Sequence, residues 1–371
     1  MDIFVTKYFV MRKFYFLVIF GFFLLSCKTT NNIQLNFLDE YVLADSIKFK
    51  NTIIGGLSGI DYVNNEYYFV VDDARNPRVL SANIVIDQNK IQSIDFKDVI
   101  FLNDSTTSFY NENSLDLESV FVDEETNKIN LVSEGSIRRG RLPSIFNIDR
   151  NGKFLESFQL PRNLSDLKNM KHNAAFEASS KSIDRKGFWA AFEAPLKADG
   201  EDPTFTKTSS PIRITYFDKA SKKGTKQFAY QLEHITKPAK GNINLNGVTA
   251  ILEYKENHFF IVERTYQNGY GSYGNILRIF DVTIDEKSTD ILEIAALEST
   301  KFIPLEKRLM FDFEDVKSEL TEGIIDNIEG ITLGPILPNG NQSLVLVADD
   351  NFQVYGKQLN QFILLEIQTN K

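Results

Sequence analysis

The sequence predicts an all-β fold built from a repeated unit of four strands. One pattern recurs five times in the same order: a short apolar strand with a polar residue near its start, a turn, and a second apolar strand that ends in charged residues. The copies start near Leu57, Leu117, Phe176, Val248 and Ile328. The first four copies each continue with two more strand-like runs around a turn. A repeat of this length predicts one radial domain rather than several independent ones.

The fifth copy is one strand short. Only the run 362–367 follows its second strand, and the missing strand is available in the segment 33–38 near the other end of the chain. Four strands per repeat, with the last sheet completed by the N-terminal segment, is the plan of a β-propeller, in which closure protects the sheet edges. We therefore expect a β-propeller of four-stranded blades closed by the N-terminal strand. Five repeats are clear, and residues 305–325 leave a sixth blade open.

Residues 1–27 have the features of a lipoprotein signal peptide. A basic start at residues 12–13 precedes an apolar run over 14–25, and Ser26 is followed by Cys27. The run is short for a transmembrane helix, although a plain membrane anchor is the alternative, and its basic start is typical of a secretory signal. The last four residues resemble a bacterial lipobox, in which Cys27 is lipidated. Cys27 is the only cysteine, so no disulfide is expected.

The domain plan follows from these two features. We expect a signal peptide over 1–27, a tether and closing strand over 28–49, and the propeller over 50–371. The chain is expected in the bacterial cell envelope, anchored to a membrane by lipid and facing the periplasm or the exterior, as a monomer. A formal net charge of −9 argues against nucleic acid as a partner.

Polar residues recur at matching points of the repeat. Near the start of the first strands these are Ser58, Glu118, Glu177, Thr249 and Glu329. At the end of the second strands they are Asp72, Glu134, Glu193, Glu263 and Asp349. The first strand of each blade lines the channel of a propeller, so acids at one repeat phase should surround one end of it. The alternative for any single acid is that it ends a strand and accepts hydrogen bonds from loop amides.

Carboxylates crowded in this way predict a metal site. They resist ionisation unless a cation lies among them, and ligands that are all oxygen favour Ca²⁺ or Mg²⁺. Only three histidines are present, which disfavours zinc. We expect Ca²⁺ as the cofactor and assign Glu177 and Glu329 to catalysis. The expected metal ligands are Asp72, Glu118, Glu134, Glu193, Glu263 and Asp349.

Two arginines lie beside these acids in the sequence. Arg75 follows Asp72 closely, and Arg264 follows Glu263 directly. A guanidinium group suits bidentate binding of phosphate or carboxylate. Arg75 and Arg264 are therefore candidates for binding an anionic substrate, and the alternative is that each arginine only pairs with its neighbouring acid.

Several of these motifs together resemble the phytase-like esterase family. They include Gly-Leu-Ser-Gly-Ile-Asp at 56–61, Val-Val-Asp-Asp-Ala-Arg at 70–75, Asp-Leu-Glu-Ser-Val at 116–120 and Asn-Ile-Glu-Gly-Ile-Thr at 327–332. The resemblance covers about residues 50–368. It implies a propeller fold and an esterase-like activity, and the family is similar to the calcium-dependent propeller phytases. One departure is that no cluster of lysines and histidine accompanies the acids, as a highly charged inositol phosphate would require.

The leading functional hypothesis is an envelope-tethered, metal-dependent hydrolase that acts on small anionic phosphate or carboxylate esters. A serine hydrolase is disfavoured, because Ser58 lacks the strand–turn–helix context of a nucleophile elbow. The alternative from another class is a non-catalytic propeller that binds a glycan or a peptide. The tyrosine-rich loop 266–275 would then contribute to ligand binding.

Overall fold

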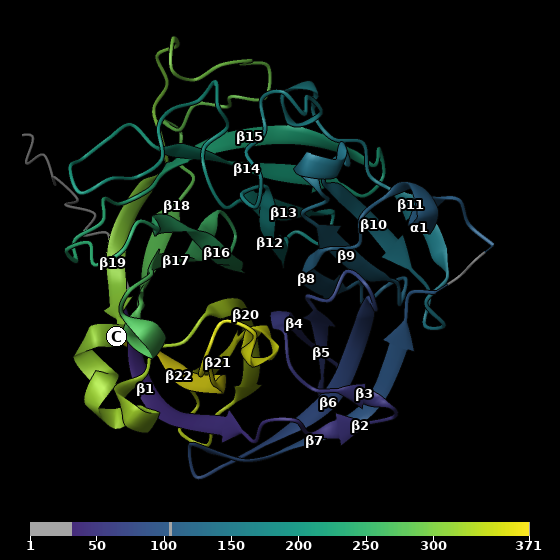
Figure 1. The fold of residues 1–371 in the computed structure, drawn as a ribbon, viewed down its shortest axis with the longest axis vertical. Coiled ribbons are helices and arrows are strands. Elements are labelled where there is room, and N and C mark those ends of the chain that lie inside the picture. Colours follow the sequence, from purple (N-terminus) through teal and green to yellow (C-terminus); the bar gives the residue numbers. More distant parts are fainter. Residues whose placement is uncertain (1–31, 104–105, 371) are drawn as a thin grey trace, which may run out of the picture.

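The computed structural model describes residues 32–103 and 106–370, which form a five-bladed β-propeller (Figure 1). Each blade is a four-stranded antiparallel sheet, and the five blades form a ring around a central axis, along which the innermost strands define the channel region. The strands, from the channel outward, are β4 (Leu57–Val63), β5 (Glu66–Val71), β6 (Arg78–Asp87) and β7 (Lys90–Phe101) in blade 1; β8 (Leu117–Val122), β9 (Ile129–Ser133), β10 (Ser144–Ile148) and β11 (Phe154–Ser157) in blade 2; β12 (Phe176–Lys181), β13 (Gly187–Phe192), β14 (Pro211–Asp218) and β15 (Lys223–Gln231) in blade 3; β16 (Asn244–Lys255), β17 (His258–Gln267), β18 (Asn275–Thr283) and β19 (Glu306–Asp312) in blade 4; and β20 (Ile328–Ile336), β21 (Gln342–Ala348), β22 (Asn360–Asn370) and β1 (Asn32–Leu43) in blade 5.

The N-terminal strand β1 is the outermost strand of blade 5. It pairs antiparallel with the C-terminal strand β22, with Asn36 opposite Glu366 and Leu43 opposite Asn360. The segment 305–325 forms no sixth blade. It contains β19, the outer strand of blade 4, followed by the short 3₁₀ helices η4 (Phe313–Glu319) and η5 (Thr321–Gly323).

Little regular structure lies outside the blades. The small sheet of β2 (Lys48–Phe49) and β3 (Thr52–Ile53) links β1 to blade 1, and the one-turn helix α1 (Phe109–Glu112) precedes blade 2. In the part of the chain that the structure describes, no helix is long and apolar enough to cross a bilayer. The expected signal peptide and Cys27 lie outside the described residues.

The core lies between the blades. Every sheet packs between two neighbours, so its inner strands are apolar on both faces, and all five residues after Glu66 in β5 are buried. The Phe69 and Phe362 rings, from blades 1 and 5, have centroids 5.9 Å apart in an edge-on contact. Continuous apolar strands of this kind bury more surface than strands that alternate with solvent, which stabilises the ring.

Strand direction defines the two ends of the channel. The first strand of each blade starts, and the second strand ends, at the same end, which we call the acidic end because the predicted acids lie there. Asn360, at the start of β22, follows the loop after Asp349 and therefore also lies toward the acidic end. Because Asn32 is opposite Asn370 in the antiparallel pair, β1 begins at the other end of the propeller.

Candidate functional site

A β-bulge occurs at the same point of every innermost strand. In β4, Leu57 and Gly59 lie opposite consecutive residues of β5, so Ser58 has no partner across the ladder. The same register shift leaves Glu118, Glu177, Thr249 and Glu329 without a partner in the other four blades. A bulge bends the strand and re-aims the extra side chain. The polar residue predicted near the start of each first strand is thus the bulge residue.

The two hydroxyl residues of this set join neighbouring blades. Ser58 Oγ donates a hydrogen bond of 2.7 Å to the carbonyl of Leu117, directly before Glu118. Thr249 Oγ1 donates a hydrogen bond of 2.8 Å to the carbonyl of Ile328, directly before Glu329. Both hydroxyls therefore fix the backbone that carries a glutamate of the next blade.

The three glutamates of this set meet in the channel. Glu118, Glu177 and Glu329 come from blades 2, 3 and 5, and each is at most 8% exposed. One carboxylate oxygen from each residue lies within 4.8 Å of the other two. Three acids at the same position of the sequence repeat therefore lie together in the fold, although they come from separate blades.

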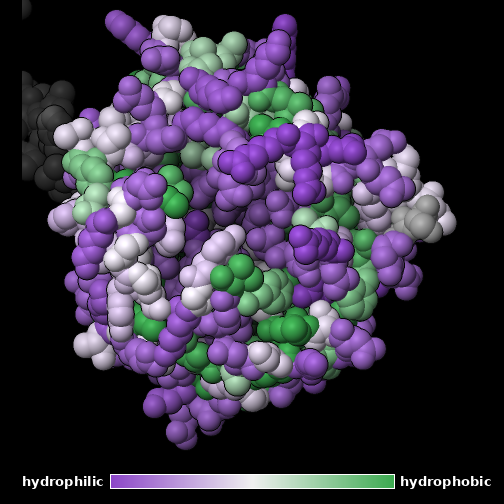
Figure 2. All heavy atoms as spheres, viewed as in Figure 1, coloured by the Kyte–Doolittle hydropathy of each residue, from purple (hydrophilic) through white to green (hydrophobic). Residues whose placement is uncertain are grey.

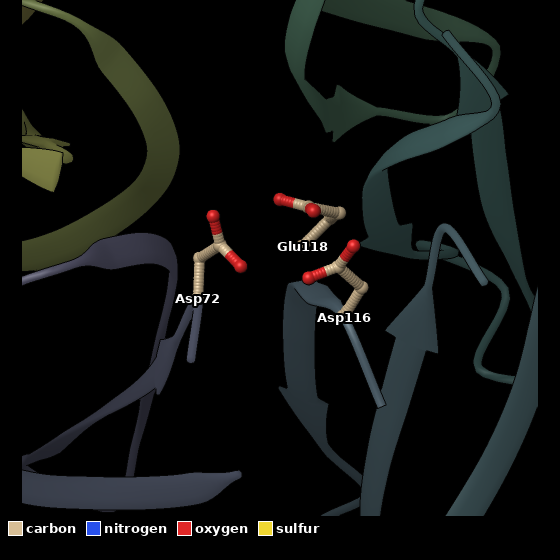
Figure 3. Close-up of side chains that lie close together, drawn as sticks. All are labelled: Asp72, Asp116 and Glu118. Carbon is tan, nitrogen blue, oxygen red and sulfur yellow. The ribbon is translucent and has the colours of Figure 1, made fainter. Parts of the chain in front are cut away.

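A second carboxylate triad shares Glu118 with the first. Its other members are Asp72, which follows β5, and Asp116, which precedes β8 (Figure 3). One oxygen of each lies within 4.8 Å of the others. Asp116 was missed by the sequence analysis because it stands before the strand rather than at a marked repeat position. Its place in Asp-Leu-Glu, two residues before a channel glutamate, is the signal that could have identified it.

Four blades place an acid directly after the second strand. In each of these blades the backbone amide of the acid donates to the carbonyl of the residue two positions before the bulge, at 2.7–2.9 Å; the acids are Asp72, Glu134, Glu193 and Asp349. We call the site opposite that residue the ring position. In blade 4 the residue at the ring position differs by one from the predicted acid. Glu263 lies opposite Val248, and Arg264 lies opposite Gly247, which is the residue two positions before the bulge residue Thr249. Arg264, not Glu263, therefore occupies the ring position.

Glu263 does not join the other acids. Its buried carboxylate lies between blades 3 and 4 and accepts hydrogen bonds from Tyr230 Oη at 2.6 Å, Asn246 Nδ2 at 2.7 Å and Lys307 Nζ at 2.8 Å. The amide of Glu233 donates a fourth, at 3.0 Å. A carboxylate with this many donors is satisfied by the fold, so the assignment of Glu263 as a metal ligand is corrected to a structural role.

Arg264 is held by acids of two other blades. Its Nη1 donates to Glu329 Oε1 at 2.6 Å, and its Nη2 lies 3.5 Å from Glu193 Oε1. The Arg264 Nε group is buried and has no hydrogen-bond partner within the described residues. The site therefore has one fixed cation among its carboxylates. Arg75, the other predicted anion-binding residue, is exposed and lies outside the cluster.

Burial and mutual repulsion raise the pKa values of these acids. Burial, followed by the charge of Asp116, raises the pKa of Asp72 to about 8. Burial also raises the pKa of Glu134 to about 8, although the amide of Ala175 donates to its carboxylate, and burial raises that of Glu193 to about 7 against the attraction of Arg264. For Glu118 and Glu177 the pKa rises for the same two reasons, burial first and neighbouring carboxylates second. Burial likewise raises the pKa of Glu329 and that of Asp349.

The channel narrows directly below the acids. The residue after each bulge is small: Gly59, Ser119, Ala178, Ala250 and Gly330. These residues line a cavity of only about 10 Å³, which is the space of about one water molecule. This cavity, which we call the waist, leaves little room for a ligand below the acids. Figure 2 shows hydrophilic residues lining the hollow at the centre of the face in view.

Comparisons with known proteins give one family match. A model of the family "Phytase-like: Esterase-like activity of phytase" matches residues 52–352. No match was found among curated proteins.

Three solved structures illustrate the more distant likenesses. The exo-β-1,3-galactanase from Phanerochaete chrysosporium is 9% identical, with 89% of this chain and 64% of that chain covered and a TM-score of 0.45. The xylan β-1,4-xylosidase from Bacillus halodurans C-125 is 10% identical, with 87% and 55% covered and a TM-score of 0.40. A thermostable family-43 glycoside hydrolase is 11% identical, with 85% and 90% covered and a TM-score of 0.43. The chain thus spans less than two thirds of the first two enzymes, and likenesses this low carry no information about activity.

The family match carries more weight than these structural likenesses, because the matched region includes all five bulges and both carboxylate triads. The protein belongs to this phytase-like family, whose description suggests a hydrolase-type function.

Proposed function

We propose that the protein is a metal-dependent hydrolase of phosphate or carboxylate esters, with Ca²⁺ as the metal. The observation that carries this proposal is the pair of carboxylate triads that share Glu118 at the closed end of a polar hollow.

The residues present fit a hard divalent cation. Calcium–oxygen distances are about 2.3–2.6 Å, so two ligands of one ion lie at most about 5 Å apart, and the oxygens of each triad, all within 4.8 Å of one another, meet this condition. The donor set is entirely oxygen, as Ca²⁺ prefers. The raised pKa values of Asp72 and Glu118 have burial and nearby carboxylates as their causes, and a bound cation removes the repulsion. Asp72, Asp116, Glu118 and Glu329 would hold the metal.

Glu177 and Glu329 have different environments and hence different roles. Glu329 accepts hydrogen bonds from Arg264 Nη1 at 2.6 Å and from Asn327 Nδ2 at 2.8 Å, which fix its orientation and stabilise its charge. No donor in the described ranges hydrogen-bonds to Glu177. Glu177 is therefore the better proton acceptor, and we assign it as the general base for the attacking water, with Glu329 as a ligand.

The remaining groups bind and orient the ester. A bound Ca²⁺ would stabilise the negative charge that develops on the ester oxygens. Arg264 keeps a permanent positive charge beside the acids, and its side chain is 13% exposed, which suits an anionic oxygen of the substrate. The narrow waist below the acids restricts solvent on that side. Together these residues would hold an ester next to Glu177.

The binding-propeller alternative has weaker support. Its expected platform, the loop 266–275, contains Tyr270, whose ring lies 3.9 Å from the ammonium group of Lys237 and 4.1 Å from that of Lys240. The Tyr270 hydroxyl also donates to the carbonyl of Pro238 at 2.5 Å. A ring covered in this way is a poor surface for stacking on a sugar.

Calcium titration with melting and ester hydrolysis tests the proposal. A ligand that binds only the folded state, at 100 times its Kd, adds about 2.7 kcal/mol to the free energy of unfolding. We expect a saturable rise in melting temperature with Ca²⁺, its reversal by EDTA, and hydrolysis of phosphate or carboxylate esters that depends on the metal. The absence of a shift with Ca²⁺, Mg²⁺ and Mn²⁺ would refute the metal mechanism.

We also propose that lipid at Cys27 anchors the protein with its acidic end turned away from the bilayer. Five residue steps separate Cys27 from Asn32, where β1 begins at the opposite end of the propeller. Five steps span at most about 18 Å, whereas the 12 residues of β1 extend for about 40 Å. The tether is too short to turn the acidic end onto the bilayer. The substrate would then be a soluble ester rather than a lipid of that membrane.

A further inference from the structure

A pocket of about 540 Å³ opens beside the acids between blades 1 and 2. It is lined by the loop after β5, the segment that leads into β8, and the loop after β9. We propose that this pocket binds a second anionic group of the substrate, a phosphate or carboxylate separate from the ester that is cleaved. This inference rests on the proposed hydrolase function for the identity of the ligand as a substrate, whereas the binding of an anion does not depend on it.

The charge of the pocket is opposite to that of the channel. Arg75, Arg139 and Arg141 line it together with neutral polar groups such as Asn103 and Asn113, and its lining includes no carboxylate among the residues that the structure describes. The volume lies within the range of about 300–1,000 Å³ for small-molecule sites. Clustered guanidinium groups in a concave site focus a positive field and offer planar, bidentate donors. The chemistry that fits is therefore a small anion with several oxygens.

The arginines do not serve only to hold neighbouring acids. Asp73, the nearest acid to Arg75 in the sequence, pairs through its carboxylate with Arg78 at 2.9 Å. Within residues 32–103 and 106–370, neither Arg75 nor Arg139 forms a side-chain ion pair. Arg141 is fixed by the backbone carbonyls of Glu112 and Asn111. The guanidinium charges of this pocket are thus not neutralised by the fold.

The walls of the pocket adjoin two of the acids along the chain. Leu115, which lines the pocket, directly precedes Asp116, and Ala74 follows Asp72 by two residues. The proposal places one ligand across both regions. The arrangement also resolves an electrostatic difficulty, because a ring of carboxylates repels an anionic substrate until metal is bound. Three arginines at its edge attract the anion and place the ester beside Asp72 and Glu118.

Equilibrium binding of inorganic pyrophosphate and of citrate to the full-length protein in detergent tests the inference. The metal is first removed with EDTA and the EDTA, itself a polycarboxylate that would compete with the probes, is then dialysed away, so an anion that binds does not bind through a metal at the acids. The two probes distinguish a phosphate pocket from a carboxylate pocket. The double variant Arg75→Ala/Arg139→Ala is compared with Arg162→Ala, which removes an exposed arginine elsewhere. Melting curves confirm that each variant is folded.

We expect the double variant to bind the preferred anion at least about tenfold more weakly, a factor that corresponds to ~1.4 kcal/mol, and Arg162→Ala to bind as the wild type does. If turnover is found, KM for an ester with a second anionic group rises in the double variant while kcat is retained, and KM for an ester without that group is unchanged. If the wild type binds neither probe, or if the double variant binds as well as the wild type, the assignment of the pocket as an anion-binding site is overturned. Loss of hydrolysis with anion binding intact would instead count against the hydrolase.

Discussion

Arg264 Nη1 lies 2.6 Å from Glu329 Oε1, and this ion pair joins blade 4 to blade 5 inside the acidic cluster. The guanidinium group occupies the ring position at which the other four blades carry an acid. Its side chain is 13% exposed and that of Glu329 is 8% exposed, so solvent screens the pair weakly. The fold thus supplies one permanent cation to a site that otherwise consists of carboxylates.

Replacing Arg264 with Met should therefore destabilise the metal-free protein in a pH-dependent way. Removal of one partner of a buried ion pair costs about 3–5 kcal/mol, because Glu329 and Glu193 lose their counter-charge. The loss should be smaller at pH 6 than at pH 8, since both acids can bind protons at the lower pH. Urea unfolding at the two pH values measures it, with Arg162→Met as the control. An equal loss at both pH values would contradict the explanation.

The metal-free protein should lose stability as the pH rises from about 5 to 8. Folding raises the pKa of Asp72 and Glu134 to about 8 and that of Glu193 to about 7, from ordinary values of 3.8 and 4.5. In this window the folded state retains protons that the unfolded chain releases, so the free energy of unfolding falls by about 1.4 kcal/mol per pH unit for each retained proton.

Calcium should reduce this slope, because Asp72, which would hold the metal, no longer binds a proton once it binds metal. Chemical unfolding between pH 5 and 8, in EDTA and in excess Ca²⁺, provides the comparison. Stability that rises with pH in EDTA would show that the acids are ionised in the metal-free fold and would exclude the raised pKa values.

Gly59 should tolerate no side chain, because it lies where blades 1 and 2 meet at the waist. A Cβ atom at this position would lie 2.9 Å from Ser119 Cα and 3.1 Å from the carbonyl of Glu118, both of which are backbone atoms. Overpacking of this kind costs about 1–3 kcal/mol, and here it also displaces Glu118. We expect Gly59→Ala to lower both the melting temperature and its rise with Ca²⁺. In the comparison variant Gly140→Ala the added methyl group meets no atom within 4 Å, and because Gly140 has a φ of +69° this variant measures the cost of backbone strain without overpacking. If the calcium response of Gly59→Ala is unchanged, packing at Gly59 does not influence the position of Glu118 in the metal site.

The blades and most of the acids could be predicted because they are contiguous in the sequence. Each first strand, turn and second strand is one short stretch, and Glu118, Glu177 and Glu329 stand at one phase of the repeat. The role of the bulge was not predictable in the same way, since it depends on pairing with the next strand. Its trace in the sequence is the small residue that follows each marker, such as Gly59 after Ser58.

Blade 4 shows why one residue was misplaced. In the other blades the second strand ends where the ring acid begins, so the end of the apolar run marks the position. β17 instead continues to Gln267, three residues beyond the ring position at Arg264. No break in the pattern distinguishes Glu263 from Arg264, and a slip of one residue moves a side chain to the other face of a sheet. The arginine pocket could not be predicted either, because its walls come from loops that are distant in the sequence.

Substitution of Cys27 by Ser should release the protein from membranes without changing the propeller. Lipid attached at Cys27 would be lost, and the chain should move from the membrane fraction to the soluble fraction after cell fractionation. The melting temperature and the response to Ca²⁺ should be retained, because the described blades begin at Asn32. A Cys27→Ser protein that stays with the membrane would favour the transmembrane anchor over the lipid.

Glu177→Gln should abolish turnover while leaving the fold in place. The amide has nearly the shape of the carboxylate but cannot accept a proton from water, so we expect kcat to fall by about 10²–10⁴. The variant should be as stable as the wild type or more stable in EDTA, because Glu177 lies within 4.8 Å of Glu118 and Glu329, and the substitution removes one of three repelling charges. Glu125→Gln, in the exposed turn between β8 and β9, is the matched control. Turnover by Glu177→Gln at the rate of this control would exclude Glu177 as the base. Because Glu329 is already paired with Arg264, the base would then have to be sought among Asp72, Glu134 and Glu193, whose pKa values of about 7 to 8 also suit the acceptance of a proton at neutral pH.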